Sequence, residues 1–202
     1  MPKVLLKEQE KLLLLIRQFN QDFGLVGGTA IALQLKHRRS VDFDLFSNSV
    51  LKIDDIKRKI RAKNKIERVL VESKDELTLI VDGVKLTFYY YPFALIFSVK
   101  YKEVIKMPSL IILAAMKVYA LGRRAKWKDY VDLYFIFKKY SFSRVVSKAK
   151  QMFGGEFSEK LLREQLCFYR DIDKSEQLRY LPGYKISDQM IEDRLKEISL
   201  SW

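Results

Sequence analysis

Two aspartates, Asp42 and Asp44, stand one residue apart shortly after a pair of glycines, Gly27 and Gly28. Residues 41–46, VDFDLF, alternate polar and apolar side chains as a half-buried strand does, so both carboxylates are expected on one face. Carboxylates about 6 to 7 Å apart along a strand suit joint chelation of a hard divalent cation such as Mg²⁺. The spacing therefore favours a metal site at which phosphate oxygens complete the coordination shell.

The glycines and Thr29 precede an apolar stretch, residues 29–35, for which we expect a helix with Thr29 as its N-cap. Small residues and free amides at the positive end of a helix form a ready site for a triphosphate. Taken alone, a glycine pair also marks a tight turn, and two nearby aspartates are common. Together the two features indicate a nucleotide held by its phosphates over a metal.

The charge balance favours a polyanionic partner. The sequence has 38 Lys plus Arg against 25 Asp plus Glu, which gives a net charge of +13 and an isoelectric point near 9.7. The surplus is concentrated in residues 52–68 and 117–128, as in proteins that bind nucleic acid. A solvated basic helix face is the alternative reading of the first segment.

Length and composition predict a globular protein with a sizeable core, because 49% of its 202 residues are hydrophobic. The longest apolar runs, residues 12–16 and 110–116, fall short of the roughly 20 residues that a membrane span requires. The charged N-terminal stretch lacks the pattern of a secretory signal. A single cysteine, Cys167, excludes an internal disulfide and is expected to be a small buried hydrophobe. We therefore expect a cytoplasmic protein.

The periodicity of apolar residues predicts an α+β fold: a mixed sheet with helices in residues 1–105, followed by a helical domain in residues 106–202. A hairpin turn is expected at Asp82 and Gly83. We expect helices at residues 3–19, 29–35, 54–63, 109–124, 126–140, 142–153, 158–172 and 187–198, and strands at 24–27, 41–46, 67–73, 76–81 and 84–91.

Three motifs in order carry a resemblance to a known family. The first combines GGT at residues 27–29 with DFD at 42–44; the second is KVYALGRR at 117–124, which matches K-L-x-A-L-x-x-R with Val118 in place of leucine. The third is KWKDYVD at 126–132, which matches R-x-K-D-x-x-D with Lys126 in place of arginine. Over residues 11–173 the sequence resembles the AbiEii/AbiGii type nucleotidyltransferases of the polymerase β-like superfamily, the toxins of phage-defence toxin–antitoxin pairs.

The resemblance implies metal-dependent transfer of a nucleoside monophosphate from an NTP to an acceptor hydroxyl, with the 3′ end of tRNA as the acceptor. The implied cofactor is Mg²⁺ or Mn²⁺, and the implied partners are NTP, RNA and a cognate antitoxin protein. The candidate catalytic residues are Asp42, Asp44, Lys117 and Asp129; the candidate nucleotide-binding residues are Gly27, Gly28, Thr29, Arg124 and Lys128; the candidate metal ligands are Asp42 and Asp44.

Helical geometry independently supports the roles of Lys117, Arg124 and Asp129. Lys117 and Arg124 are seven positions apart, so they share one face of an otherwise apolar helix and can offset triphosphate charge. Asp129, the candidate for orienting the nucleotide or the attacking hydroxyl, shares a helix face with Asp132. Structural roles remain open for both acids, because Asp129 stands near a helix start and Lys128 with Asp132 is an i,i+4 pair.

One departure from the superfamily pattern keeps alternatives open. The strand expected to supply a third carboxylate carries Thr87 instead, so either one metal suffices or Asp129 takes part. The alternatives are an enzyme of the same fold that modifies a protein, and a catalytically silent nucleotide- or RNA-binding module. His37, the only histidine, is expected in a solvated loop.

Overall fold

The computed structural model describes residues 3–124 and 126–201. The chain forms two compact units. The sheet unit contains Lys3–Leu33 and Arg39–Ser109, and the helical unit contains Gln34–Arg38 and the chain from Leu110 onward. The short segment Gln34–Arg38 thus belongs by its contacts to the helical unit, although it lies within the N-terminal half of the sequence.

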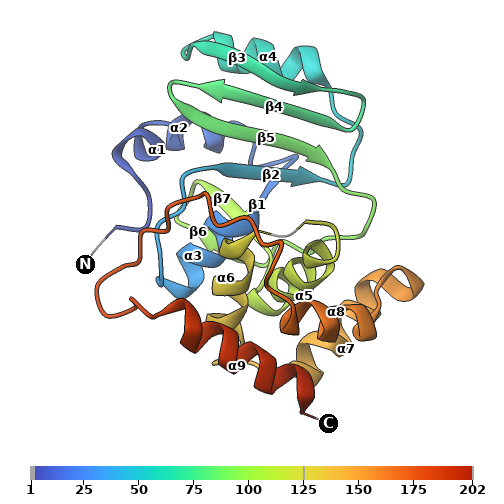
Figure 1. The fold of residues 1–202 in the computed structure, drawn as a ribbon. Helices are drawn as coiled ribbons and strands as arrows, with labels where there is room; N and C mark the ends of the chain where they lie inside the picture. The colour runs from blue at the N-terminus through green and yellow to red at the C-terminus, as the bar shows by residue number, and fades with distance from the viewer. Residues whose placement is uncertain (1–2, 125, 202) are drawn as a thin grey trace. The chain divides into compact units, whose positions relative to one another are not determined.

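The sheet unit is built on a five-stranded mixed sheet in the order β1-β2-β5-β4-β3 (Figure 1). Strands β2 and β5 are parallel, and the other neighbours are antiparallel. The strands are β1 (Gly24–Val26), β2 (Phe43–Ser47), β3 (Ile66–Glu72), β4 (Glu76–Val81) and β5 (Val84–Tyr90). The mixed sheet with its helices confirms the predicted α+β class.

The strands have one apolar and one polar face because their side chains alternate. Phe43 and Leu45 of β2 are almost fully buried, whereas Asp44 between them is half-buried on the opposite face. The predicted turn between β4 and β5 is confirmed, since Asp82 and Gly83 both have positive φ, 46° and 77°. This conformation matches the twist of a two-residue hairpin.

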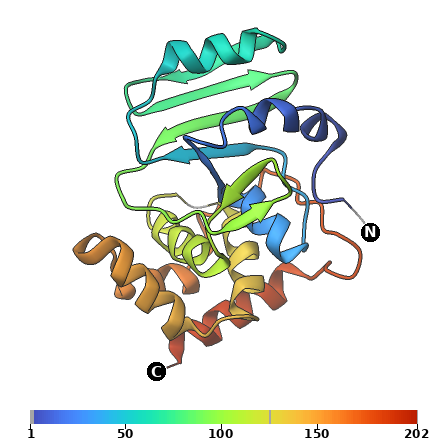
Figure 2. The ribbon, with the colours of Figure 1, turned by 180° about the vertical axis from the view of Figure 1, so that it is seen from behind.

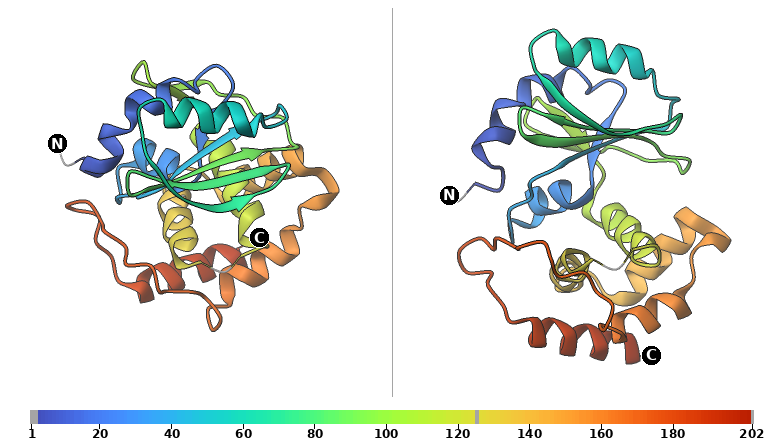
Figure 3. Two further views of the ribbon diagram at one scale, coloured as in Figure 1. Left: turned by 90° about the horizontal axis from the view of Figure 1, so that it is seen from above. Right: turned by 45° about the horizontal axis from the view of Figure 1, so that its top comes forward.

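Three helices cover the apolar face of the sheet (Figure 3): α1 (Lys7–Lys11), α2 (Leu13–Arg17) and α4 (Ile53–Arg61). Phe19, just after α2, packs edge-on against Phe88 of β5 with ring centroids 4.8 Å apart. The single helix predicted for residues 3–19 is therefore wrong in part. It is interrupted at Leu12, whose amide bonds to the carbonyl of Gln9 in a tighter turn.

A short hairpin of β6 (Val99–Tyr101) and β7 (Ile105–Met107) completes the sheet unit (Figure 2). The sequence pattern did not predict this hairpin, because each strand has only three residues. In the part of the chain that the structure describes, no helix combines the length and the apolar character that crossing a membrane requires.

The helical unit confirms the helices predicted after Pro108, but the one predicted for residues 109–124 ends at Leu121 and the one predicted for residues 158–172 ends at Cys167. They are α5 (Leu110–Leu121), α6 (Trp127–Phe137), α7 (Phe142–Phe153), α8 (Glu159–Cys167) and α9 (Asp188–Leu200), with a 3-10 turn, η1 (Gly154–Glu156), after α7. Ser141, Ser158 and Ser187 begin α7, α8 and α9, and each side chain accepts a hydrogen bond from an amide of the first turn. Such caps satisfy donors that a helix start leaves unpaired.

The sheet core supplies a test of the fold. Leu86 on β5 is fully buried, whereas Leu70 on the edge strand β3 is 44% exposed. We expect Leu86→Ala to lower the free energy of unfolding by about 2–5 kcal/mol, because it removes buried methyl groups and leaves a cavity. The matched change Leu70→Ala should cost less than about 1 kcal/mol. Urea unfolding followed by circular dichroism measures both, and equal losses would contradict the sheet arrangement.

Candidate functional site

In the sheet unit, Gly27 brings the backbone against the carboxylate of Asp44. Val26, at the end of β1, is paired with Asp44 of β2, and Gly27 follows with φ of 67° at the start of α3 (Gly27–Leu35). A Cβ atom at Gly27 would clash with Asp44 Oδ2. Any other residue would therefore have to adopt an unfavourable positive φ and displace this carboxylate.

Thr29 has a different place from the one predicted. Helix α3 begins at Gly27, so Thr29 lies inside it and the predicted N-cap role is wrong. The Thr29 side chain is 1% exposed. Its hydroxyl is hydrogen-bonded to the carbonyl oxygen of Asp42 and to Ser40 Oγ, the latter at 2.9 Å. Thr29 thus fixes the backbone from which the Asp42 side chain projects.

Strand β2 begins at Phe43, one residue after Asp42, so only Asp44 of the two acids is a strand residue. Both acids are half-buried. Asp42 Oδ2 forms an ion pair with Lys85 Nζ of β5 at 2.9 Å. The two carboxylates thus flank Phe43 at the start of the strand, and Asp42 is held at two points, by its own carbonyl and by Lys85.

The position opposite Asp44 confirms the departure noted in the sequence. The parallel register pairs Asp44 with Thr87 of β5, whose hydroxyl lies 3.3 Å from that of Thr78 on β4. Among the described residues, no group of three or more His, Cys, Asp or Glu side chains is arranged to hold a metal. Two carboxylates still fit Mg²⁺, which usually keeps several waters and binds one or two carboxylates plus substrate phosphates.

In the helical unit, Lys117 and Arg124 converge on Asp129. Lys117 Nζ donates to Asp129 Oδ1 at 2.7 Å, and Arg124 donates twice to the same carboxylate, at 2.9 and 3.1 Å. Asp129, in the first turn of α6, is fully buried, whereas the Arg124 side chain is 47% exposed. The predicted shared helix face is wrong, because α5 ends at Leu121 and Arg124 lies beyond it; the two cations meet only through their common partner, Asp129.

Asp132, one turn further along α6, binds three groups. Arg38 donates to both of its oxygens, at 2.7 and 2.9 Å, His37 Nε2 lies 2.8 Å away, and Lys117 Nζ lies 3.0 Å away. His37, Arg38, Lys117 and Asp132 are all buried. Asp129 and Asp132 therefore share Lys117, as their common helix face predicted.

Two predictions about this region are wrong. His37 is not in a solvated loop; it is fully buried and in contact with Asp132. Lys128 does not pair with Asp132, because its ammonium binds Glu176 at 2.7 Å instead. The sequence offered no signal for either contact, since the partners are 95 and 48 positions apart in the chain.

Mutual pairing keeps the buried charges ionised. Burial alone would raise the pKa of Asp132, but the nearby charges of Arg38 and Lys117 outweigh it and hold this pKa well below its ordinary value. Burial likewise opposes ionisation of Asp129, and Lys117 with Arg124 lowers its pKa. For His37, burial dominates and lowers the pKa below 6.5, so the imidazole is neutral and donates from Nε2 to Asp132.

Comparison with solved structures defines the class of fold. The nucleotidyltransferase toxin MenT4 of Mycobacterium tuberculosis superposes with a TM-score of 0.62 at 13% identity, over 95% of this chain and 81% of the toxin. JHP933 of Helicobacter pylori gives a TM-score of 0.56 at 18% identity, over 96% of this chain and 91% of that protein. The chain therefore has the nucleotidyltransferase fold.

Sequence comparison identifies a relative within this class. The uncharacterized protein aq_aa25 of Aquifex aeolicus is 32% identical over 161 residues, which cover 76% of this chain and 69% of the relative. No protein-family model matches the sequence. The chain belongs to the same family as aq_aa25.

Burial of His37 should make the free energy of unfolding depend on pH between about pH 7 and 5. Its pKa is lowered from 6.5 in the folded protein, so the unfolded chain binds more protons below about pH 6.5. The free energy of unfolding should therefore fall as the pH is lowered from 7 to 5, by at most about 1.4 kcal/mol per pH unit. Urea unfolding at a series of pH values measures this slope.

The matched control is His37→Gln, which keeps a side-chain donor for Asp132 but has no proton to gain. Because the chain has one histidine, this variant should lose the dependence between pH 7 and 5. Equal slopes for the parent and the variant would show that His37 is not buried in its neutral form.

Proposed function

We propose that this protein transfers a nucleoside monophosphate from an NTP to an acceptor hydroxyl and releases pyrophosphate. The observation that carries the proposal is the approach of the Asp44 carboxylate to Gly27 at the start of α3. This approach puts a metal-binding group beside free backbone amides at a helix N-terminus, where phosphate groups bind. The nucleotidyltransferase fold supports the same chemistry.

In this proposal Asp42 and Asp44 hold Mg²⁺ or Mn²⁺. A bound ion would neutralise the negative charge that develops on the phosphate oxygens during transfer. Gly27 and Gly28 offer backbone amides to the phosphates. Thr29, as a buried partner of the Asp42 carbonyl, serves the nucleotide site by positioning that aspartate.

The candidate residues of the helical unit are Asp129 and its partners. Arg124 has an exposed side that can donate to phosphate oxygens. Lys117 is buried with two carboxylate partners, so we assign it the role of fixing Asp129, which orients the nucleotide or the attacking hydroxyl. Lys128, held by Glu176, is the remaining candidate for nucleotide binding.

We propose RNA, at the 3′ end of tRNA, as the acceptor. The net charge of +13 supports a phosphate backbone as partner. The motif resemblance supports an AbiEii/AbiGii type toxin with a cognate antitoxin, acting in the cytoplasm in phage defence or growth control. The second candidate function is a catalytically silent nucleotide- or RNA-binding module, which is favoured by Thr87 in place of a third acid. Modification of a protein is a further outcome, and the test of the acceptor distinguishes it.

The metal site is tested by Asp42→Asn and Asp44→Asn. Each should abolish transfer, because a neutral amide is a poor ligand for Mg²⁺, and each should leave the fold intact. The measurement is incorporation of labelled nucleotide together with pyrophosphate release. Asp22→Asn, at an exposed aspartate of the same unit, is the matched control. Activity within about threefold of the parent, about 0.65 kcal/mol, would remove that aspartate from the metal site.

The RNA partner is tested by salt and by charge reversal. RNA affinity should fall steeply between low and physiological salt, because basic side chains displace condensed counterions. Changing Arg58, Arg61 and Lys63, all exposed in or just after α4, to glutamate should weaken RNA binding without changing NTP binding. Fluorescence anisotropy measures both affinities.

A second triple variant separates a local effect from the change in net charge. Lys100, Lys102 and Lys106 are also exposed in the sheet unit, and their reversal alters the net charge equally. It should weaken RNA binding less than the α4 variant does. Equal losses from the two variants would mean that no defined basic face binds the RNA.

A further inference from the structure

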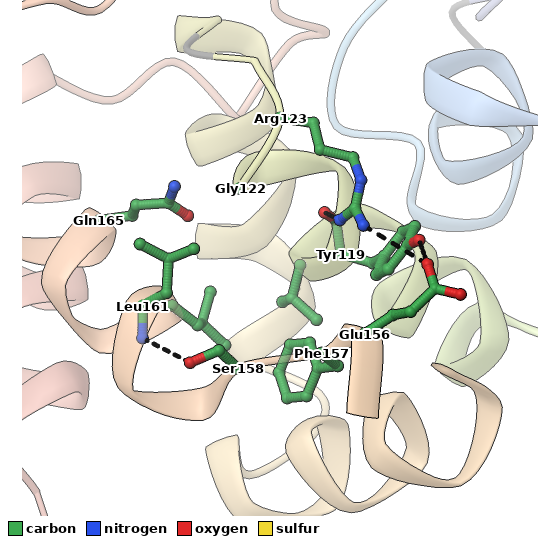
Figure 4. Close-up of a pocket in the computed structure, with 10 residues that line it drawn as sticks. Tyr119, Gly122, Arg123, Glu156, Phe157, Ser158, Leu161 and Gln165 are labelled. Carbon is green, nitrogen blue, oxygen red and sulfur yellow. Dashed lines mark hydrogen bonds and ion pairs between the residues drawn. The ribbon is translucent and has the colours of Figure 1, made fainter. Parts of the chain in front are cut away.

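The helical unit contains a cavity of about 330 Å³ that the proposed reaction does not use (Figure 4). Its volume is in the range of small-ligand sites, roughly 300–1,000 Å³. The cavity is open to solvent on one side and is lined by α5, the helix that also carries Lys117, together with η1 and α8. The lining residues that matter for its chemistry are Tyr119, Gly122, Arg123, Glu156, Leu161 and Gln165.

One wall is a fixed stack of planar groups. The Tyr119 ring stacks on Phe153 with centroids 4.0 Å apart and an interplanar angle of 14°. The Arg123 guanidinium lies 3.6 Å from the centre of the Tyr119 ring. Glu156 fixes this pair, because it accepts a hydrogen bond from the Tyr119 hydroxyl at 2.7 Å and lies 3.7 Å from Arg123. The wall therefore presents a flat, half-exposed cation.

The opposite wall combines an apolar surface with an unused hydrogen-bond acceptor. Leu161 is 44% exposed although it is a large aliphatic residue. Gln165 Oε1 is buried and has no hydrogen-bond partner among the described residues. A buried acceptor of this kind costs free energy unless a ligand or water supplies a donor.

Gly122 leaves the space between the walls open. A Cβ atom there would meet Leu161 Cδ2 at 3.6 Å and Gln165 Nε2 at 3.8 Å, which are ordinary contacts. Neither a positive φ nor a tight approach therefore requires glycine at this position. A larger side chain would occupy the cavity and cover the Gln165 amide.

We propose that this cavity binds one unpaired nucleobase. A base offers flat faces to Leu161 and to the Arg123 plane, and its edge offers hydrogen-bonding groups to the side-chain amide of Gln165, which lines the cavity. Proteins that bind single-stranded RNA combine the same elements, a stacking plane and hydrogen bonds to the base edge. The proposal rests on the proposed function, since the base belongs either to a free nucleotide substrate or to the RNA acceptor.

The test measures binding in the absence of divalent metal, so that no transfer takes place. The probes are the four nucleoside monophosphates, an unstructured single-stranded RNA and a duplex RNA, each titrated against the full chain. Gly122→Leu fills the cavity, and Gln165→Leu removes the amide. Their matched controls are Gly155→Leu, whose Cβ has nothing within 4 Å, and Gln189→Leu on α9. Thermal melting checks the fold of every variant.

Both cavity variants should weaken single-strand binding by about tenfold, and the controls should change it by less than about twofold. Duplex binding should be unaffected. If monophosphates bind with the same sensitivity, the base is that of the free nucleotide; if only the single strand does, it belongs to the RNA. If Gly122→Leu does not fold, Gln165→Leu decides, because it removes an amide oxygen without a partner.

Unchanged single-strand and monophosphate binding in Gln165→Leu would overturn the proposal. If the parent protein transfers nucleotides and the cavity variants bind RNA and monophosphates as the parent does, the base site is disproved and the proposed function is not. A protein that binds as expected but never transfers a nucleotide, with metal restored, would disprove the proposed function and leave the base site standing.

Discussion

The buried carboxylate of Asp132 is the interaction on which the helical unit depends. Removing a charge from water costs several kcal/mol, and only close partners offset that cost. Arg38 binds both oxygens of Asp132, and Lys117 and His37 bind one oxygen each. Because Lys117 also holds Asp129, the carboxylate of Asp132 determines the geometry of the whole charged group. Loss of one partner would leave an uncompensated charge, at a cost of about 3–5 kcal/mol.

A separate set of contacts, within the sheet unit, fixes the candidate metal ligands Asp42 and Asp44. Thr29 and Lys85 hold Asp42, while Asp44 rests against Gly27. The candidate metal ligands are thus held by the Thr29 hydrogen bond, the Lys85 ion pair and the close approach of Gly27. Such preorganisation is what electrostatic stabilisation of a transition state requires.

Local patterns predicted most of the elements, and distant contacts account for what they missed. The repeat of apolar residues predicted the strands β3, β4 and β5 and the helices of the helical unit. In each of these elements the repeat continues over enough residues to be recognised. The seven-residue spacing of Lys117 and Arg124 predicted a shared helix face, but α5 ends at Leu121, and it is Asp129 that brings the two cations together. No local pattern revealed that His37 is buried or that Thr29 holds the Asp42 carbonyl. In both cases a residue 13 or more positions away decides the environment, and propensity alone would put a histidine among basic residues at the surface.

The most direct test of nucleotidyl transfer compares NTPs labelled at the α and the γ phosphorus. Each is incubated with the protein and Mg²⁺, with and without total tRNA, and the RNA and protein fractions are separated and counted. Nucleotidyl transfer to RNA predicts α label in the RNA, no γ label in any acceptor, and release of the γ label in pyrophosphate. Label from the γ position in an acceptor, α label in protein alone, or no incorporated label would contradict it.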